Sequence, residues 1–308
     1  LILLMLCGCS MPAAPNTVVL PQTPAENHTE SAPASAEPAQ TTPETNAFHL
    51  EYEQTALPEP LSSVTALTML EETLLLGGVS ETGLALVRLT PEGRSEELPL
   101  PGSTEYLYAL CPDGAGGAWL LCGSLPKGYF DAFGNFRFLS QEPEGKLALA
   151  HYDAAFALQE IVLLQTLYTD RFFQLRRLDG GFCMMSASLL VRLDETGAET
   201  ARQSLDAKDG WSFAAMQETD GVLYALTQNF YEIELPELRK FTPDTLSALE
   251  SDVCTSEITG LGLRADGRLL MGNSEELFAY DTGSGETETL VRWQEIGANV
   301  LTEQPWEL

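Results

Sequence analysis

Gly181-Phe182-Cys183-Met184-Met185, followed after a short turn by Val191-Arg192-Leu193-Asp194-Glu195-Thr196-Gly197, is the stretch that decides the fold. The first segment is a glycine-led apolar run, and the second is a strand-like run that ends in a polar turn. The same pair of segments returns five times along the chain. The other four glycine-led or turn-led apolar runs lie at 72–76, 117–121, 221–225 and 267–271.

These runs recur with a nearly constant period. Aligning Leu74, Trp119, Cys183, Leu223 and Leu269 gives intervals of 45, 64, 40 and 46 residues. Apart from one long interval, this is the period of a four-stranded propeller blade. No stretch resembles a helix of twelve or more residues with a 3.6-residue period. The sequence therefore predicts an all-β fold, a β-propeller of four-stranded blades. A flat β-sandwich is the alternative, but it would not require one motif at a fixed period.

The residues before each apolar run predict the innermost strand of each blade, at 64–70, 106–111, 172–177, 213–217 and 258–264. Five complete blades extend from about Val64 to Trp293. After them, 298–302 resembles the approach to another inner strand. Near the start of the predicted propeller (48–308), Phe48, Leu50 and Tyr52 alternate with polar residues as a lone strand. Propellers commonly close by lending such a strand to the last blade, so we expect at least six blades, with the remainder beyond Leu308.

The N-terminal segment predicts export and lipidation. Residues 1–9 form an apolar run that is too short to span a bilayer, and they read as the end of a signal peptide. Leu6-Cys7-Gly8-Cys9 resembles the bacterial lipobox, in which the last Cys becomes the lipidated N-terminus. This resemblance implies lipidation at Cys9. The alternative is a soluble secreted protein with a conventional cleavage site nearby.

Residues 10–47 predict a disordered tether. They contain seven Pro, many Ala, Thr and Ser, and no Lys or Arg, so they cannot form a core. As a random coil the segment would hold the propeller roughly 30–40 Å from its anchor. We therefore expect an extracytoplasmic protein that is attached to the cell membrane through lipid.

The charge balance excludes several partners. The chain has 45 Asp and Glu against 16 Lys and Arg, for a formal net charge of −29. A surface that binds phosphates needs clustered Lys and Arg, so nucleic acid and anionic lipid headgroups would both be repelled. The only membrane contact that we expect is the lipid anchor.

A wider pattern carries a family resemblance: a lipobox, a Pro/Thr/Glu tether, an acidic propeller, and Tyr280-Asp281-Thr282-Gly283 followed by Leu290-Val291-Arg292-Trp293. The chain resembles the N-terminal half of long lipoproteins of Gram-positive anaerobes, in which a propeller precedes an extracellular solute-binding domain of ABC importers. The resemblance implies a binding or docking module, with the solute-binding domain beyond Leu308. The alternative is a free-standing envelope scaffold or adhesion propeller.

The search for catalytic motifs predicts that the chain is not an enzyme. It contains no His-Glu-x-x-His, Gly-x-Ser-x-Gly or Walker motif, so we expect no catalytic residues, cofactor or metal. A lyase or sialidase-like enzyme would need convergent Arg, Tyr and carboxylates on one face. We interpret His151 as a partly buried strand residue. The turn aspartates are expected to cap backbone N–H groups; they are Asp113, Asp194, Asp266 and Asp281.

The remaining cysteines predict free thiols rather than disulfides. Cys111 and Cys122 flank one hairpin, but a turn centred near Gly114 places Cys111 opposite Trp119. This register does not suit a disulfide. We therefore expect Cys111, Cys122, Cys183 and Cys254 to be small buried thiols.

The long interval contains the candidate binding loop. The segment 124–145 is rich in aromatic residues, and it lies between the second and third strands of a blade, where loops often bind ligands. Such a loop could stack on a carbohydrate, or grip a peptide or an envelope protein. Trp211 would border the same face. The alternatives are an extra hairpin for the loop and ordinary core packing for Trp211. The candidate residues are Tyr129, Phe130, Phe133, Phe136 and Trp211.

Overall fold

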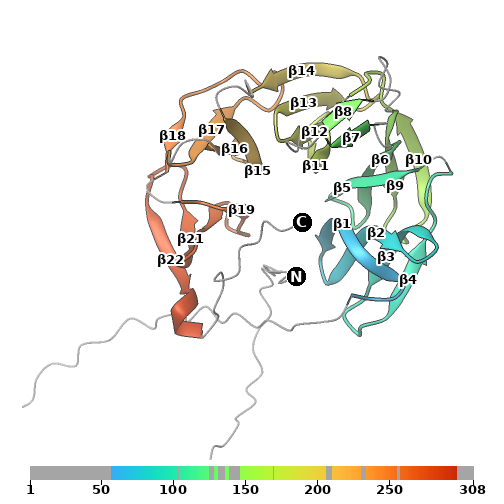
Figure 1. The fold of residues 1–308 in the computed structure, drawn as a ribbon. Helices are drawn as coiled ribbons and strands as arrows, with labels where there is room; N and C mark the ends of the chain where they lie inside the picture. Colours follow the sequence, from blue (N-terminus) through green and yellow to red (C-terminus); the bar gives the residue numbers. More distant parts are fainter. Residues whose placement is uncertain are drawn as a thin grey trace, which may run out of the picture. The chain divides into compact units, whose positions relative to one another are not determined.

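A computed structural model describes residues 57–102, 104–124, 128–130, 136–138, 146–168, 170–205, 210–229, 234–254 and 257–296. All of them belong to the compact unit Glu53–Leu308. They form five four-stranded antiparallel sheets arranged as a β-propeller, which Figure 1 shows following one another around a common centre. No helix in this part of the chain has the length and hydrophobicity needed to cross a membrane.

Each blade is built from four strands in order from the centre outwards. Blade 1 contains β1 (Leu61–Leu70), β2 (Thr73–Ser80), β3 (Gly83–Leu89) and β4 (Ser95–Leu98). Blade 2 contains β5 (Tyr106–Pro112), β6 (Ala118–Gly123), β9 (Leu147–Tyr152) and β10 (Leu158–Leu163). Blade 3 contains β11 (Phe172–Leu178), β12 (Gly181–Ser186), β13 (Leu189–Asp194) and β14 (Glu199–Ser204).

The last two blades follow the same order. Blade 4 contains β15 (Trp211–Thr219), β16 (Val222–Asn229), β17 (Glu237–Phe241) and β18 (Asp252–Val253). Blade 5 contains β19 (Gly260–Leu263), β20 (Leu269–Gly272), β21 (Glu276–Tyr280) and β22 (Thr287–Arg292), and a 3₁₀ turn, η2 (Trp293–Ile296), follows it. A separate hairpin pairs β7 (Gly128–Phe130) with β8 (Phe136–Phe138).

The predicted fold class and the five predicted blades are confirmed. Every predicted inner strand is present, although β19 begins at Gly260 rather than at Ile258, which is buried before the strand starts. The β7–β8 hairpin accounts for the one long interval, because it is inserted between β6 and β9. The predicted closing strand at 48–52 and the predicted start of another inner strand at 298–302 lie outside the described residues.

The glycines that lead the second strands meet two different constraints, a close approach and a positive φ, and Gly181, with a φ of +151°, meets both. A Cβ on Gly117 would lie 2.2 Å from the Tyr152 carbonyl oxygen, and one on Gly181 would lie 2.0 Å from the Leu193 carbonyl oxygen. At these two positions the third strand passes too close for any side chain. Gly221 meets nothing within 4 Å, but its φ of +70° is a left-handed conformation that favours glycine.

Successive side chains of a strand point to opposite faces of its blade. Those on one face are buried against the preceding blade, and those on the other face against the following blade. On β12, Phe182 and Met184 pack in a cluster with blade 2, whereas Cys183 and Met185 pack in a cluster with blade 4. This is the period of two expected for a strand buried on both faces. Four such clusters each join two blades that are consecutive in the sequence.

Side chains also form hydrogen bonds with the backbone groups on the free edges of the inner strands. Gln174 Oε1 accepts the Met216 N–H at 2.7 Å, and Arg176 Nε donates to the Met216 carbonyl oxygen at 3.4 Å. In the same way, Thr65 Oγ1 donates to the Leu107 carbonyl oxygen at 2.9 Å. The inner strand of a blade has no partner strand on the side of the centre, so these bonds replace the missing ladder.

Cys111, Cys122 and Cys183 are buried thiols, as predicted, whereas Cys254 is only partly buried; no disulfide joins the described cysteines. Cys111 pairs with Trp119 across β5 and β6, which is the predicted register. Burial raises the pKa of the Cys111 and Cys183 thiols to about 12, and that of Cys122 to about 11. All three therefore remain protonated at neutral pH and pack as small apolar groups.

Candidate functional site

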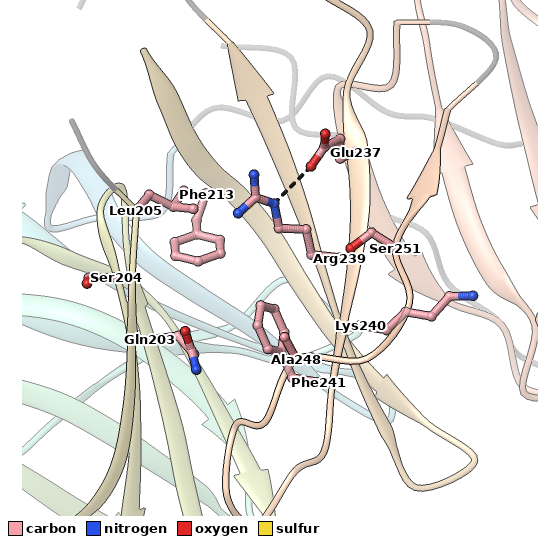
Figure 2. Close-up of a pocket in the computed structure, with 10 residues that line it drawn as sticks. All are labelled: Gln203, Ser204, Leu205, Phe213, Glu237, Arg239, Lys240, Phe241, Ala248 and Ser251. Atoms are coloured by element: carbon pink, nitrogen blue, oxygen red, sulfur yellow. Dashed lines mark hydrogen bonds and ion pairs between the residues drawn. The ribbon is translucent and has the colours of Figure 1, made fainter. Parts of the chain in front are cut away.

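A hollow lies at the junction of blades 3 and 4 (Figure 2). Its volume is about 160 Å³, and it lies between the outer strand of blade 3 and the face of blade 4. Phenylalanine side chains line one part of it, whereas charged and hydroxyl side chains line the rest. The lining residues are Gln203, Ser204, Leu205, Phe213, Glu237, Arg239, Lys240, Phe241, Ala248 and Ser251.

The alternation of β17 places the charged groups of this hollow. Glu237, Arg239 and Phe241 are two residues apart, so their side chains share the face of the strand that looks toward blade 3. On the neighbouring strand β16, Glu237 pairs with Thr227 and Arg239 pairs with Ala225. Both partners are small and fully buried, so the longer side chains of β17 can extend over them.

Two contacts hold the Arg239 side chain in place. Its guanidinium lies over the Trp211 ring, with Cζ 5.5 Å from the ring centroid, a cation–π contact that reaches across β16 to β15. Its Nε donates to Glu237 Oε2 at 3.0 Å. Figure 2 shows the guanidinium between Glu237 and Phe213. Trp211 is the first residue of β15, so its predicted position at the start of an inner strand is confirmed.

The segment after β17 joins the hollow to blade 3. Gln203 on β14 donates from Nε2 to the Leu246 carbonyl oxygen at 2.9 Å. Leu246 is fully buried in the cluster shared by blades 3 and 4, although its φ is +50°. A positive φ is uncommon for a branched side chain and persists where the surroundings fix it. The fixed turn keeps the walls of the hollow together.

The described residues of the predicted binding loop include the two strands of the β7–β8 hairpin. Tyr129 and Phe130 belong to β7 and Phe136 belongs to β8, whereas Phe133 lies outside the described residues. The backbone register pairs Phe130 with Phe136. A binding role for these residues and for Trp211 stays a prediction. The sequence interpretation missed Arg239, which lies over the Trp211 ring, and its partner Glu237.

A second cluster of functional groups lies in blade 2. His151 Nε2 and Asp113 Oδ2 are 3.0 Å apart, and the His151 ring stacks on Trp119 with a centroid distance of 4.4 Å. Trp119 and His151 face each other across β6 and β9, and Asp113 follows β5 in the adjoining turn. The sequence interpretation of His151 as a partly buried strand residue is confirmed, but its partner was missed.

The Asp113 carboxylate is held by several donors. Oδ1 accepts the N–H groups of Ala115 and Gly117 at 2.7 and 2.8 Å, so the predicted capping role of Asp113 is confirmed. Burial acts to raise the pKa of Asp113, but the hydrogen bonds from His151 and from these two N–H groups outweigh it and leave the pKa below its ordinary value. The carboxylate form therefore stabilises the fold.

Asp113→Asn is expected to lower the free energy of unfolding at pH 7 by about 1–3 kcal/mol, because partly buried donors lose a charged acceptor. Since the folded-state pKa is depressed, this contribution is present above the ordinary pKa near 4 and is lost as the pH falls through the lower folded value. Urea unfolding at pH 7, 5 and 3 checks the prediction. The exposed Asp244→Asn is the control. A difference that stays undiminished at pH 3 would contradict the assignment.

The other turn aspartates also cap backbone groups, as predicted. Asp194 accepts the N–H groups of Thr196 and Ala198, and Asp281 accepts those of Gly283 and Ser284. Asp266 accepts the Arg268 N–H. Within the described ranges, no three His, Cys, Asp or Glu side chains come together as metal ligands.

The comparisons with known proteins extend to the fold alone. No family model and no curated protein matches the sequence. Among solved structures, the chain is similar to a 6-phosphogluconolactonase-like protein from Bacteroides uniformis, with 11% identity and a TM-score of 0.44 over 77% of this chain and 85% of that one. It is also similar to an engineered GH43 glycoside hydrolase, with 11% identity and a TM-score of 0.43 over 74% of this chain and 52% of that one.

Virginiamycin B lyase from Staphylococcus aureus is the third similar structure, with 10% identity and a TM-score of 0.42 over 73% of this chain and 83% of that one. All three carry the names of enzymes. The prediction that the chain is not an enzyme is wrong as an inference, because missing sequence motifs do not exclude an enzyme on a fold whose similar structures carry enzyme names. At these identities no activity is transferred to this chain.

Proposed function

We propose that this chain is a lipid-anchored, extracytoplasmic binding propeller that holds part of a small polar ligand in the hollow between blades 3 and 4. In this proposal it is the N-terminal module of a solute-binding lipoprotein that serves an ABC importer. The observation that carries the binding role is the Glu237–Arg239 pair in the wall of that hollow, with the Arg239 guanidinium held against the Trp211 ring.

The size of the hollow supports binding of one group rather than of a whole solute. Its volume of about 160 Å³ is below the roughly 300–1,000 Å³ of pockets that enclose drug-sized ligands. A terminal residue of a peptide or one edge of a sugar ring matches this space.

The lining supports a polar ligand with an apolar side. The rings of Phe213 and Phe241 are almost completely buried beneath the hollow. The charged groups of Glu237 and Arg239 on β17 provide an acceptor and donors beside them. An apolar surface with a few placed polar groups is typical of small-molecule sites. Carbohydrates and short peptides are the ligand classes that combine both properties.

The sequence supports the anchor and the location. The lipobox-like Leu6-Cys7-Gly8-Cys9 is followed by the Pro-rich segment 10–47 without Lys or Arg. A single lipid-modified terminus on such a tether keeps the propeller near the membrane while leaving its faces accessible. The acidic propeller itself would be repelled by anionic headgroups.

Lipidation is tested by metabolic labelling of the full chain with an alkyne fatty acid in a bacterial host. We expect Cys9→Ala to lose essentially all label and to leave the membrane fraction, because the acceptor thiol is gone. The matched Cys7→Ala variant should keep both. Labelling that persists in Cys9→Ala, or membrane attachment without label, would contradict the anchor.

Glycan and peptide arrays probed with the full chain test the binding role, and Trp211→Ala should weaken any binding at the hollow.

A further inference from the structure

Arg239 presents an unused pair of donor groups at the hollow. Its Nε is engaged by Glu237, but none of the hydrogen bonds among the described residues uses its Nη1 or Nη2. We propose that these two groups form a carboxylate-binding subsite, so that the ligand is a small carboxylate such as a uronic acid or the C-terminus of a peptide. This inference rests on the proposed function and names the ligand class of the same site.

The subsite is fixed before a ligand arrives. The Trp211 ring lies against the guanidinium, with 5.5 Å between Cζ and the centroid, and the 3.0 Å bond to Glu237 fixes the rotation of the planar group. On β16, the residues paired with Arg239 and Glu237 are the small, buried Ala225 and Thr227, so no long side chain of that strand displaces the guanidinium. Holding the side chain in advance reduces the conformational entropy that is lost on binding.

The geometry of the guanidinium favours a carboxylate. Two parallel N–H groups match the two oxygens of a carboxylate, and this bidentate pair is stronger and more directional than a single hydrogen bond. The side chain of Arg239 is 28% exposed, so it is partly shielded from water while still accessible. Figure 2 shows one terminal nitrogen of the guanidinium directed toward Phe213, beside which the ligand would lie.

The neighbouring Glu237 selects against more highly charged anions. A phosphate monoester carries close to two negative charges at neutral pH and would lie beside this carboxylate, whereas a monocarboxylate brings only one. Carboxylate oxygens also accept hydrogen bonds, so Glu237 favours a hydroxyl or ammonium group next to the carboxylate of the ligand. Uronic acids offer the first of these groups.

The net charge of the protein does not prevent anion binding at this point. At physiological ionic strength the Debye length is about 8 Å, so distant carboxylates are screened. Close to the hollow, the Arg239 guanidinium and the Glu237 carboxylate are one cation and one anion, whereas Lys240 points to the opposite face of β17. We therefore expect binding to be kept or strengthened as salt rises from 20 to 150 mM.

The test titrates the full chain, labelled with ¹⁵N in its tryptophans, with glucuronate, glucose, N-acetyl-alanine, N-acetyl-alanine amide and inorganic phosphate. The indole N–H signal of Trp211 is identified from its loss in Trp211→Phe. We expect the two carboxylates to shift this signal, and their uncharged analogues and phosphate to bind at least tenfold more weakly. Arg239→Gln should weaken carboxylate binding at least tenfold, and Arg239→Lys should fail to restore it because the fork is lost.

Arg264→Gln is the matched control, because Arg264 is a similarly exposed arginine in ion pairs with Asp266 and Glu288 of blade 5. It should bind as the wild type does. Equal binding of the uncharged analogues, preference for phosphate, or full binding by Arg239→Gln would each overturn the proposal. If Arg239→Gln does not fold, Arg239→Lys decides, since binding equal to that of the wild type would show that the fork is not used.

The binding function and the carboxylate subsite are distinguished by different outcomes. If an uncharged glycan or peptide from the arrays shifts the Trp211 signal and no carboxylate does, the carboxylate subsite is wrong and the binding function stands. If no compound in the arrays or the titrations affects Trp211, both are wrong.

Discussion

Gly181→Ala is expected to lower the free energy of unfolding by about 4 kcal/mol or more, among the largest effects of a single substitution. A Cβ at this position would lie 2.0 Å from the Leu193 carbonyl oxygen and 2.5 Å from Arg192 Nη1. The carbonyl belongs to β13, which is paired with β12 along its length, so the backbone cannot move away without breaking the ladder. Chemical unfolding followed by circular dichroism measures the change.

Gly221→Ala is the matched control for this substitution. Gly221 also precedes a second strand, but a Cβ there meets nothing within 4 Å, and only its φ of +70° opposes alanine. The expected cost is about 1–2 kcal/mol, the penalty of a left-handed conformation. Equal losses at the two positions would show that the close approach of β13 is not the cause.

Phe182→Ala is expected to lower the free energy of unfolding by about 3–5 kcal/mol, because it leaves a cavity at the junction of blades 2 and 3. Phe182 is 1% exposed, its ring meets Trp119 edge to face at 4.9 Å, and the guanidinium of Arg177 lies 4.6 Å from its centroid. Thermal and urea unfolding of the variant provide the measurement.

Phe173→Ala provides the comparison on the adjoining strand. Phe173 is 41% exposed, so truncating it removes little buried surface, and the expected loss is about 1 kcal/mol or less. A loss for Phe182→Ala that is no greater than this would contradict the role of the ring as a wedge between two blades.

The sequence predicted the blades because strand pairing is local within each of them. Turn glycines and apolar runs mark the hairpins, and the fixed period shows that one unit is repeated. The same reasoning placed Cys111 opposite Trp119, since counting outward from a turn sets the register of a hairpin. Sequence reasoning did not distinguish glycines required by a close approach from those required by a positive φ. The close approach at Gly181 involves β13, which comes later in the chain.

The candidate site was less accessible to sequence reasoning. Trp211 was singled out by its position, but Arg239 lies 28 residues further along and reaches it only across β16. The available signal was the alternation of Glu237, Arg239 and Phe241 opposite the small residues of the preceding strand. The partner of His151 was hidden for a similar reason, since 38 residues separate it from Asp113.

Each shared hydrophobic cluster joins two successive blades, so the local unfolding of one blade exposes apolar surface of its neighbours. In the described part of the chain, such an array behaves as a row of coupled units, in which thermal fraying starts at the outermost sheets and reaches the middle ones last. The hollow lies between blades 3 and 4, so a bound molecule would contact both of them. Each of these two blades also packs against another blade on its other face. Ligand binding would then reduce local opening of the middle blades, while the first and last blades of the described chain would continue to open.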